Sequence, residues 1–209
     1  QGNVIVTGRY AGSVDFGGGP LVPGTMSSRL FVAKLDAADG HHLWSRSFGE
    51  GPGPSVGYAV ATDGEDNVVV TGSFSGSIDF GEGPLVAQGG SDVFVVKLDR
   101  MSGAHRWSHS FGDSAEQQGA AVSVDAADNV IVTGSFHRAI DFGEGPFQSL
   151  GGSNAFLLKL DPAGATVWSK RFGEHKGARG TASAVAQTGE VVVTGSFDGD
   201  ADFGGGSLK

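Results

Sequence analysis

A segment ending in Val-Thr-Gly recurs four times along this chain at nearly constant spacing. Its copies begin at Asn3, Asn67, Asn129 and Glu190, which lie 64, 62 and 61 residues apart. Other landmarks recur in step with it: an Asp-Phe-Gly triplet in all four copies, and a Lys-Leu-Asp triplet, a tryptophan and a Phe-Gly pair in three. A fixed period of this kind indicates a repeat architecture, in which every copy forms one supersecondary unit.

Each complete copy contains four strand-like runs, which we name A to D. In the third copy they cover residues 120–124, 130–136, 155–160 and 167–172. Run A is made of small and β-branched residues, as suits a crowded inner strand, whereas run D alternates apolar with polar residues, as a half-exposed outer strand does. The chain opens at a B run and ends just after the fourth one, so the sequence predicts 13 strands and no helix. The 37 glycines fit many short strands joined by tight turns.

The connections between the runs fall into two kinds. The A–B turn (63–67 and its copies) and the C–D turn (99–103 and its copies) are short, whereas the B–C connection runs for some 17 residues around Asp-Phe-Gly. Short turns join antiparallel neighbours, and four meandering strands repeated at a fixed period are typical of a β-propeller. We therefore expect an all-β chain that forms one β-propeller domain, a partial ring of four-stranded antiparallel blades with a 61–64-residue repeat.

The expected blades cover approximately residues 1–56, 57–118, 119–179 and 180–209, of which the first and the last are incomplete. Because the first residues already read as a turn that enters a strand, we expect the chain to be a segment of a longer protein. Two copies would supply roughly the residues of a seven-bladed ring. Joined head to tail, however, they would duplicate a B strand, so we expect a segment rather than a dimeric ring.

Alternate connections of a meander lie at opposite ends of the sheet, which sorts the connections into two faces of the ring. The short A–B and C–D turns share one face, and the longer B–C and D–A loops share the other. The D–A loops also differ most between copies, as at 49–54, 112–117 and 173–178. Since binding function tends to lie on loops held by a rigid scaffold, we expect any ligand to bind at the long-loop face.

Four aspartates, Asp15, Asp79, Asp141 and Asp202, open the Asp-Phe-Gly triplets. A kinase is not expected, because neither a strand lysine behind a Gly-rich loop nor a His-Arg-Asp motif accompanies them. Carboxylates in Gly-rich loops with exposed carbonyls suit Ca²⁺, although each loop offers one strong carboxylate, joined in two copies by a glutamate. Two alternatives stay open: the four aspartates bind Ca²⁺, or, as we favour, each caps a turn while the following phenylalanine fills the gap between blades.

Other candidate groups point away from catalysis. The lysine of each Lys-Leu-Asp triplet is expected to pair locally, and the histidines do not keep register between copies: His109 aligns with Arg46 and Lys170. Changing basic residues at one position predict a solvated outer strand rather than a metal site. No Ser-His-Asp or paired-carboxylate constellation stands out, so we expect a protein that is not an enzyme and needs no cofactor, with Ca²⁺ as the exception named above.

Charge and composition limit the partners. The formal net charge is −9 and the pI is near 4.9, so a nucleic acid is not an expected partner. The chain has no cysteine, which removes disulfides and thiolate ligands. Its apolar runs are far shorter than the roughly 18 residues that a membrane helix needs, so no membrane span is expected.

The repeated motifs resemble those of the bacterial seven-bladed β-propeller (SBBP) repeat family. In the second copy they read Val70-Thr71-Gly72, Asp79-Phe80, Gly89-Gly90 and Phe94-Val95-Val96-Lys97-Leu98-Asp99, and the next blade opens with Asp128-Asn129-Val130. The resemblance covers essentially the whole chain. It implies a propeller fold and an exported bacterial protein located extracellularly, at the cell surface or in the periplasm.

The outer-strand tryptophans depart from that pattern. Trp44, Trp107 and Trp168 are similar to those of quinoprotein propellers, in which Asp, Gly and Trp close the C–D hairpin; Asp36 and Gly40 have the corresponding spacing before Trp44. The likeness implies shared blade packing only, because a quinoprotein dehydrogenase needs a cofactor pocket at the ring centre.

The sequence thus favours a non-catalytic propeller module that binds a protein or a glycan through the face of the B–C and D–A loops. One alternative is an enzyme whose ring-centre site lies in blades outside this segment, and another is a purely structural spacer. Self-association, or contact with the remaining blades of a longer chain, is a further expected interaction.

Overall fold

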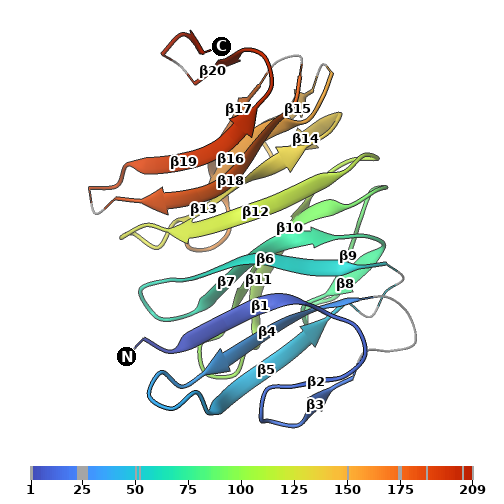
Figure 1. The fold of residues 1–209 in the computed structure, drawn as a ribbon, viewed down its shortest axis with the longest axis vertical. Helices are drawn as coiled ribbons and strands as arrows, with labels where there is room; N and C mark the ends of the chain where they lie inside the picture. Colours follow the sequence, from blue (N-terminus) through green and yellow to red (C-terminus); the bar gives the residue numbers. More distant parts are fainter. Residues whose placement is uncertain are drawn as a thin grey trace.

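The structure, a computed structural model, describes residues 2–22, 28–49, 51, 53–149, 151–173, 176–186, 188–203 and 205–208. In these ranges all regular secondary structure is β, which confirms the predicted all-β class. Thirteen strands of seven or eight residues form four antiparallel sheets, units 1 to 4, which stack side by side in chain order (Figure 1). The arrangement is a propeller-like repeat.

Units 2 and 3 are complete four-stranded meanders, and units 1 and 4 contain three and two strands. Unit 1 is ordered β1 (Val4–Tyr10), β4 (Arg29–Leu35), β5 (His42–Phe48). Unit 2 is ordered β6 (Ser55–Thr62), β7 (Val68–Phe74), β10 (Asp92–Leu98), β11 (His105–Phe111). Unit 3 is ordered β12 (Gln117–Val124), β13 (Val130–Phe136), β16 (Asn154–Leu160), β17 (Thr166–Phe172), and unit 4 pairs β18 (Ala178–Val185) with β19 (Val191–Phe197).

The B–C connections are more ordered than the sequence predicted. Each contains a small antiparallel hairpin, so the described residues form 21 strands rather than the predicted 13. The hairpins are β2 (Val14–Asp15) with β3 (Pro20–Leu21), β8 (Ser77–Asp79) with β9 (Pro84–Val86), β14 (Ala139–Asp141) with β15 (Pro146–Gln148), and β20 (Ala201–Asp202) with β21 (Ser207–Leu208). Strands of two or three residues are too short to show the alternation that identifies a strand in a sequence.

The two kinds of connection lie at opposite ends of the sheets, as predicted. At one end the C–D turn of unit 2 contacts the A–B turn, because the Arg100 guanidinium donates to the Glu65 carbonyl at 3.1 Å. At the other end the Ala139 N–H in the B–C hairpin of unit 3 donates to the Asp113 carboxylate at 3.2 Å, within the loop that leads into β12. The long-loop end is therefore a continuous surface that joins neighbouring units.

The Val-Thr-Gly motif is explained by contact between units. Thr71 of unit 2 donates its hydroxyl to the Phe94 carbonyl at 2.8 Å, which orients the side chain. Gly119 of unit 3 approaches that hydroxyl so closely that a Cβ at this position would lie 2.2 Å from it. The contact recurs between units 1 and 2 and between units 3 and 4, with Gly57 against Thr7 and Gly180 against Thr133. Glycine is required here because of space rather than because of backbone conformation.

The hydrophobic core lies between the sheets rather than within any one of them. One buried cluster joins Leu30 and Phe48 of unit 1 to Val70 and Phe94 of unit 2, and a second joins Val95 of unit 2 to the phenylalanines of unit 3. Neighbouring units therefore bury the faces that they turn toward each other, as the blade model expects.

The outer-strand tryptophans dock on the following unit. Trp44 of unit 1 lies against Gly103 of unit 2 and donates its indole N–H to the Arg100 carbonyl at 3.1 Å. Trp107 repeats this contact with Pro162 in unit 3, also at 3.1 Å. The sequence expectation placed the tryptophan in its own hairpin. The structure places it between units, because the indole points along the stack of sheets.

Candidate functional site

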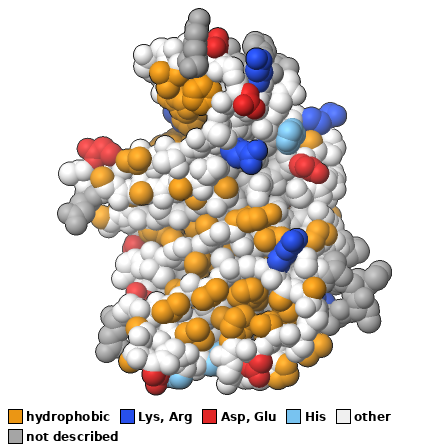
Figure 2. Space-filling view, in the orientation of Figure 1, with side chains coloured by type: hydrophobic (Ala, Val, Ile, Leu, Met, Phe, Trp, Pro, Cys, Tyr) orange, Lys and Arg blue, Asp and Glu red, His pale blue; other side chains and the backbone are white. Residues whose placement is uncertain are grey.

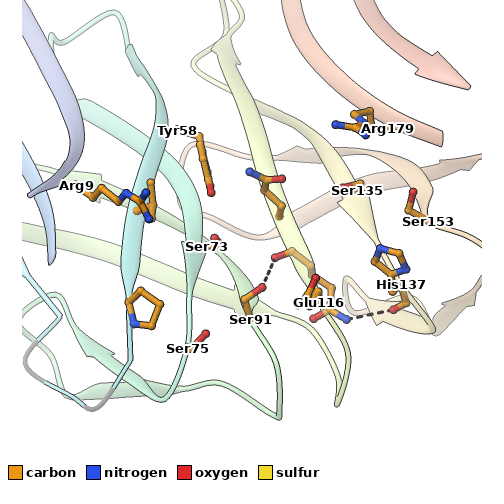
Figure 3. Close-up of a pocket in the computed structure, with 14 residues that line it drawn as sticks. Arg9, Tyr58, Ser73, Ser75, Ser91, Glu116, Ser135, His137, Ser153 and Arg179 are labelled. Carbon is orange, nitrogen blue, oxygen red and sulfur yellow. Dashed lines mark hydrogen bonds between the residues drawn. The ribbon is translucent and has the colours of Figure 1, made fainter. Parts of the chain in front are cut away.

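A polar groove of about 420 Å³ crosses the inner strands near the long-loop end. It runs from Arg9 on β1, past Tyr58 on β6, to Arg179 on β18, so that all four units contribute to it (Figure 3). The view of Figure 2 faces these inner strands and shows charged side chains spread from the lower to the upper units, with apolar side chains gathered over the lower end and again over the upper end of the stack. We take this groove as the candidate functional site.

The groove gathers residues that break the repeat. Strand register aligns Arg9 of β1 with Ser73 of β7 and Ser135 of β13, since each stands one position after the Val-Thr-Gly segment. Three other groove residues also differ from the residues at the same position in other copies, which are small, uncharged or, in one copy, negatively charged. These departures are Tyr58 against Ala120 and Thr181, His137 against Ser75 and Asp198, and Arg179 against Val56 and Gln118.

These residues were not predicted as site residues, although the sequence carries a signal for them. Residues that recur in every copy form the scaffold, whereas a binding site on a repeat scaffold is made of residues that do not recur. Positions at which a single copy becomes large or charged therefore indicate the site. Arg9 is the clearest example, because the other three copies have serine there.

The large polar side chains of the groove are available to a ligand. No hydrogen bond or ion pair joins the side chains of Arg9, Tyr58, Glu116, His137 or Arg179 to any residue that the structure describes. All five are exposed, and Tyr58 presents 47% of its surface. A concave surface lined by unpaired donors and acceptors can fix the orientation of a polar ligand.

Gln117 holds the loops that carry two of these side chains. It is 1% exposed, and its Nε2 donates to Asp113 at 2.7 Å. The same Nε2 donates to the His137 carbonyl at 3.2 Å (Figure 3). The His137 N–H in turn donates to the Glu116 carbonyl at 3.0 Å. Glu116 and His137 are therefore positioned by a buried amide rather than by a free loop.

Behind the groove, Asp92 is a buried carboxyl group. Burial raises its pKa above the usual range, and it is 1% exposed. Its Oδ2 accepts the Gln88 N–H at 3.2 Å, whereas its Oδ1 has no hydrogen-bond partner among the described atoms. Asp92 supports the floor of the long-loop end but does not line the groove.

In the two complete units the lysines of the Lys-Leu-Asp triplets pair locally, as predicted, at the end of the sheets away from the groove, whereas Lys34 of unit 1 donates to the Arg100 carbonyl of unit 2 at 3.0 Å. Lys97 contacts Asp63 at 2.7 Å and Lys159 contacts Asp125 at 2.8 Å. Burial tends to raise the pKa of Asp125, but hydrogen bonds from Lys159 and Asn129 outweigh this effect and lower the pKa to about 2. In each complete unit this ion pair connects strand C to the A–B turn and so stabilises the short-turn end.

The four aspartates proposed for Ca²⁺ lie far from the groove lining, each at the turn of a B–C hairpin. The Oδ1 of Asp79 accepts the N–H groups of Gly81 at 2.7 Å and of Gly83 at 3.1 Å. Asp15 and Asp141 make the same two bonds, and Asp202 accepts the Gly206 N–H at 3.1 Å. The carboxylates thus cap their turns, and Ca²⁺ binding by Asp15, Asp79, Asp141 and Asp202 stays a prediction.

The phenylalanines of the same triplets in units 2, 3 and 4 lie at the junctions between units, whereas Phe16 of unit 1 packs on Phe31 of its own unit, with ring centroids 4.9 Å apart. Phe80 is 4% exposed and its ring centroid lies 5.0 Å from that of Phe48 in unit 1. Phe142 packs in the same way on Phe111, at 5.1 Å. Phe203 is 54% exposed, because in unit 4 the described strands at this position are β18 and β19 alone.

Among the described residues, one group of three side chains has metal-ligand atoms within 4.8 Å of one another. It consists of Asp36, Asp39 and His41 in the exposed C–D turn of unit 1, and it includes none of the four capping aspartates. The Asp39 carboxylate is already bonded to His41 at 2.7 Å. We assign no site to this group.

Comparison with known proteins agrees with the coarse fold. No family model matches the chain, so membership of the SBBP family stays a prediction. The chain is similar to the uncharacterized WD repeat-containing protein L264 of Acanthamoeba polyphaga mimivirus, with 28% identity over 155 residues. That match covers 66% of this chain and 11% of the relative, so the chain spans about a tenth of the relative's length.

A solved structure of a protein of unknown function from Bacteroides caccae has 13% identity and a TM-score of 0.30, and the match covers 90% of this chain and 64% of that one. In the described ranges no helix is long and apolar enough to cross a membrane. The repeated antiparallel sheets and the similarity to a WD-repeat protein together indicate that this chain is an all-β, propeller-like repeat protein.

Proposed function

We propose that the chain is a non-catalytic β-propeller module that binds a protein or a glycan in the groove bounded by Arg9 and Arg179. The observation that carries this proposal is that four large or charged side chains that break the repeat, Arg9, Tyr58, His137 and Arg179, line one concave surface. Repeat-breaking residues also occur outside the groove, as at Arg106 on β11, but these four come from all four units and face the same space. A place in an exported or surface-attached bacterial protein belongs to the same proposal and is supported by the resemblance of the repeats.

The side chains of the groove favour binding over catalysis. A nucleophile and its base are normally within hydrogen-bond reach of each other. In the described structure His137 has no side-chain hydrogen bond to a serine or to Glu116, although all of them line the groove. The repeat scaffold is pinned at the opposite end, as a rigid platform for binding loops requires.

The test replaces groove residues with the residues that the repeat has at the same position. Arg9→Ser and Arg179→Val introduce side chains that the fold already accepts in other units, so the variants should fold. Lys170→Ser is the matched control, because it also removes one exposed positive charge, on outer strand β17. Wild-type protein is screened on glycan and protein arrays, and calorimetry then measures the affinity of each hit for all variants.

We expect a ligand whose affinity falls about tenfold in each groove variant, the loss of about one charge-assisted hydrogen bond, and stays unchanged in Lys170→Ser. Hits that bind all variants equally would remove the groove as the binding site. Conversion of a bound ligand to product, detected by mass spectrometry, would favour the enzyme alternative instead.

A further inference from the structure

The side chains that line the groove carry a net positive formal charge, although the whole chain is negatively charged. Among its lining residues two guanidinium groups, Arg9 and Arg179, stand against one carboxylate, that of Glu116, whereas the whole chain has a formal net charge of −9. At physiological ionic strength exposed charges more than about 8 Å apart are largely screened. A ligand in the groove therefore responds to these local groups more strongly than to the net charge.

The two arginines stand at opposite sides of the groove (Figure 3). Arg9 belongs to β1 of unit 1 and Arg179 to β18 of unit 4, with inner strands β6 and β12 between them. A ligand that engages both needs two acidic groups separated by the width of units 2 and 3. A single inorganic anion or a small monoacid could reach only one of them. The spacing therefore favours an extended ligand with repeated acidic groups.

Between the arginines the lining offers one aromatic ring and a set of hydroxyl groups. Tyr58 is exposed between the two guanidinium groups (Figure 3). The hydroxyls of Ser73 and Ser135 lie on neighbouring units and have no hydrogen-bond partner among the described residues. An aromatic ring can cover the C–H face of a sugar, because that face is apolar, while serine hydroxyls can donate to and accept from sugar hydroxyls.

The lining also argues against an acidic peptide. Protein partners are usually held by large side chains that fill apolar pockets at the centre of the interface. Of the fourteen residues that line the groove, only Pro54 and Val56 lack a polar side-chain atom. A peptide would leave many of these polar groups unpaired, whereas a chain of sugars carries hydroxyls along its whole length.

We propose that the groove binds an acidic oligosaccharide. The carboxylates of two separated sugar units pair with Arg9 and Arg179, and a sugar ring between them packs on Tyr58. Guanidinium groups suit this role because they bind carboxylates through two parallel hydrogen bonds. The proposal rests on the binding function above and names the ligand class of the same site.

The experiment measures binding of oligogalacturonate to the whole 209-residue chain by calorimetry, and of two matched probes. Fully methyl-esterified oligogalacturonide has the same sugar backbone without the charges, and poly-glutamate has the charges without the sugar. Arg9→Ser, Arg179→Val and Tyr58→Ala are compared with Lys170→Ser. The Tyr58 substitution introduces the residue found at Ala120, its counterpart in unit 3.

We expect oligogalacturonate to bind, and the methyl ester and poly-glutamate to bind at least about tenfold more weakly, since each loses either the ion pairs or the hydroxyl and ring contacts. Each groove variant should weaken oligogalacturonate binding about tenfold and Lys170→Ser should not. Binding should also weaken as salt is raised, because the ion pairs are exposed.

Three results would overturn the proposal: no binding of oligogalacturonate, equal binding of poly-glutamate, or equal binding by Tyr58→Ala and wild type. The array screen separates this failure from failure of the proposed function. A protein hit that depends on Arg9 and Arg179 would leave the groove as a binding site with another ligand class. If no glycan or protein hit depends on these arginines, both proposals fail together.

Discussion

His109 shows how a single residue can contradict a pattern read from aligned copies. Because its counterparts are Arg46 and Lys170, the sequence predicted a solvated outer strand. In the structure the imidazole instead packs between Trp107 and Phe111, with ring centroids 5.5 and 6.1 Å away. Its Nε2 is buried without a hydrogen-bond partner among the described atoms, against the C–D turn of unit 3.

This burial should make the junction between units 2 and 3 sensitive to pH. Burial lowers the pKa of His109 below its usual value of about 6.5. As the pH falls, the unfolded chain therefore takes up a proton at this residue before the folded chain does. The contribution of the neutral His109 to the free energy of unfolding decreases as the pH falls below about 6.5, and below the folded pKa this contribution is gone. The thermal unfolding midpoint of the wild-type chain should fall between pH 7.5 and pH 5. We expect this fall to be smaller in His109→Phe.

His41 provides the control, because its shift has the opposite sign. The hydrogen bond that the protonated His41 donates to the Asp39 carboxylate raises the pKa of His41, so this residue contributes stability at low pH and loses it as the pH rises through the folded pKa. In His41→Gln the thermal unfolding midpoint should therefore fall between pH 7.5 and pH 5 at least as steeply as in the wild-type chain. A pH profile of His109→Phe that superimposes on the wild-type profile would contradict the role given to His109.

The groove residues mark the limit of what this sequence could predict at the residue scale. The capping aspartates could be foreseen, because they recur and their partners lie two to four residues away. Local pairing of the lysines could be foreseen from their recurrence, but their partners Asp63 and Asp125 lie in the preceding A–B turns and could not be identified from the sequence. Arg9 and Arg179 could not be foreseen, since their position at the two sides of one groove depends on how four units stack. Without a structure, repeat-breaking residues can be found, but their meeting in one groove cannot.

At the scale of the element, the strand order and the turns were predictable, and the hairpins in the B–C connections were not. Continuous apolar runs identify β7 and β10, which are buried on both faces, and alternation identifies outer strand β11. Short turns mark where these strands end, and each strand has seven or eight residues. The hairpin strands contain two or three residues and depend on a capping aspartate rather than on a hydrophobic pattern.

The three outer-strand tryptophans allow a comparison of the same residue in different neighbourhoods. Trp44 is 7% exposed and donates to the Arg100 carbonyl of the next unit, whereas Trp168 is half-buried and its indole makes no hydrogen bond with a described residue. We expect Trp44→Ala to lower the free energy of unfolding by about 3–5 kcal/mol. Trp168→Ala should cost about 1 kcal/mol, and urea denaturation measures both.

Trp44→Phe separates the packing of the indole from its hydrogen bond. It keeps an aromatic ring over Gly103 but removes the donor to the Arg100 carbonyl, so the expected loss is about 1 kcal/mol. Equal losses for Trp44→Ala and Trp168→Ala would mean that the docking contact between units contributes little. The outer strands would then be held mainly by their own sheets.

At the scale of the whole molecule, the two end units expose what the middle units bury. In the described structure β1 and β19 are each paired along one edge only. Val4 and Val6 of β1 are 49% and 38% exposed, and Val192 and Phe203 of unit 4 are 57% and 54% exposed. Unpaired strand edges beside apolar side chains are surfaces that readily associate with other chains.

The 209-residue chain is therefore expected to self-associate as its concentration rises, mainly through unit 4. An apolar groove of about 440 Å³ lies there, lined in part by Phe172, Phe197 and Phe203. A lysine beside an edge strand opposes pairing, because association would bury its charge. Val192→Lys combined with Phe203→Ser should thus shift the mass measured by light scattering toward the monomer. Met101→Lys, at a residue that is 75% exposed in a C–D turn, should not. A wild-type chain that stays monomeric over the whole concentration range would show that these exposed faces are stable in water, and the end units would then need no partner.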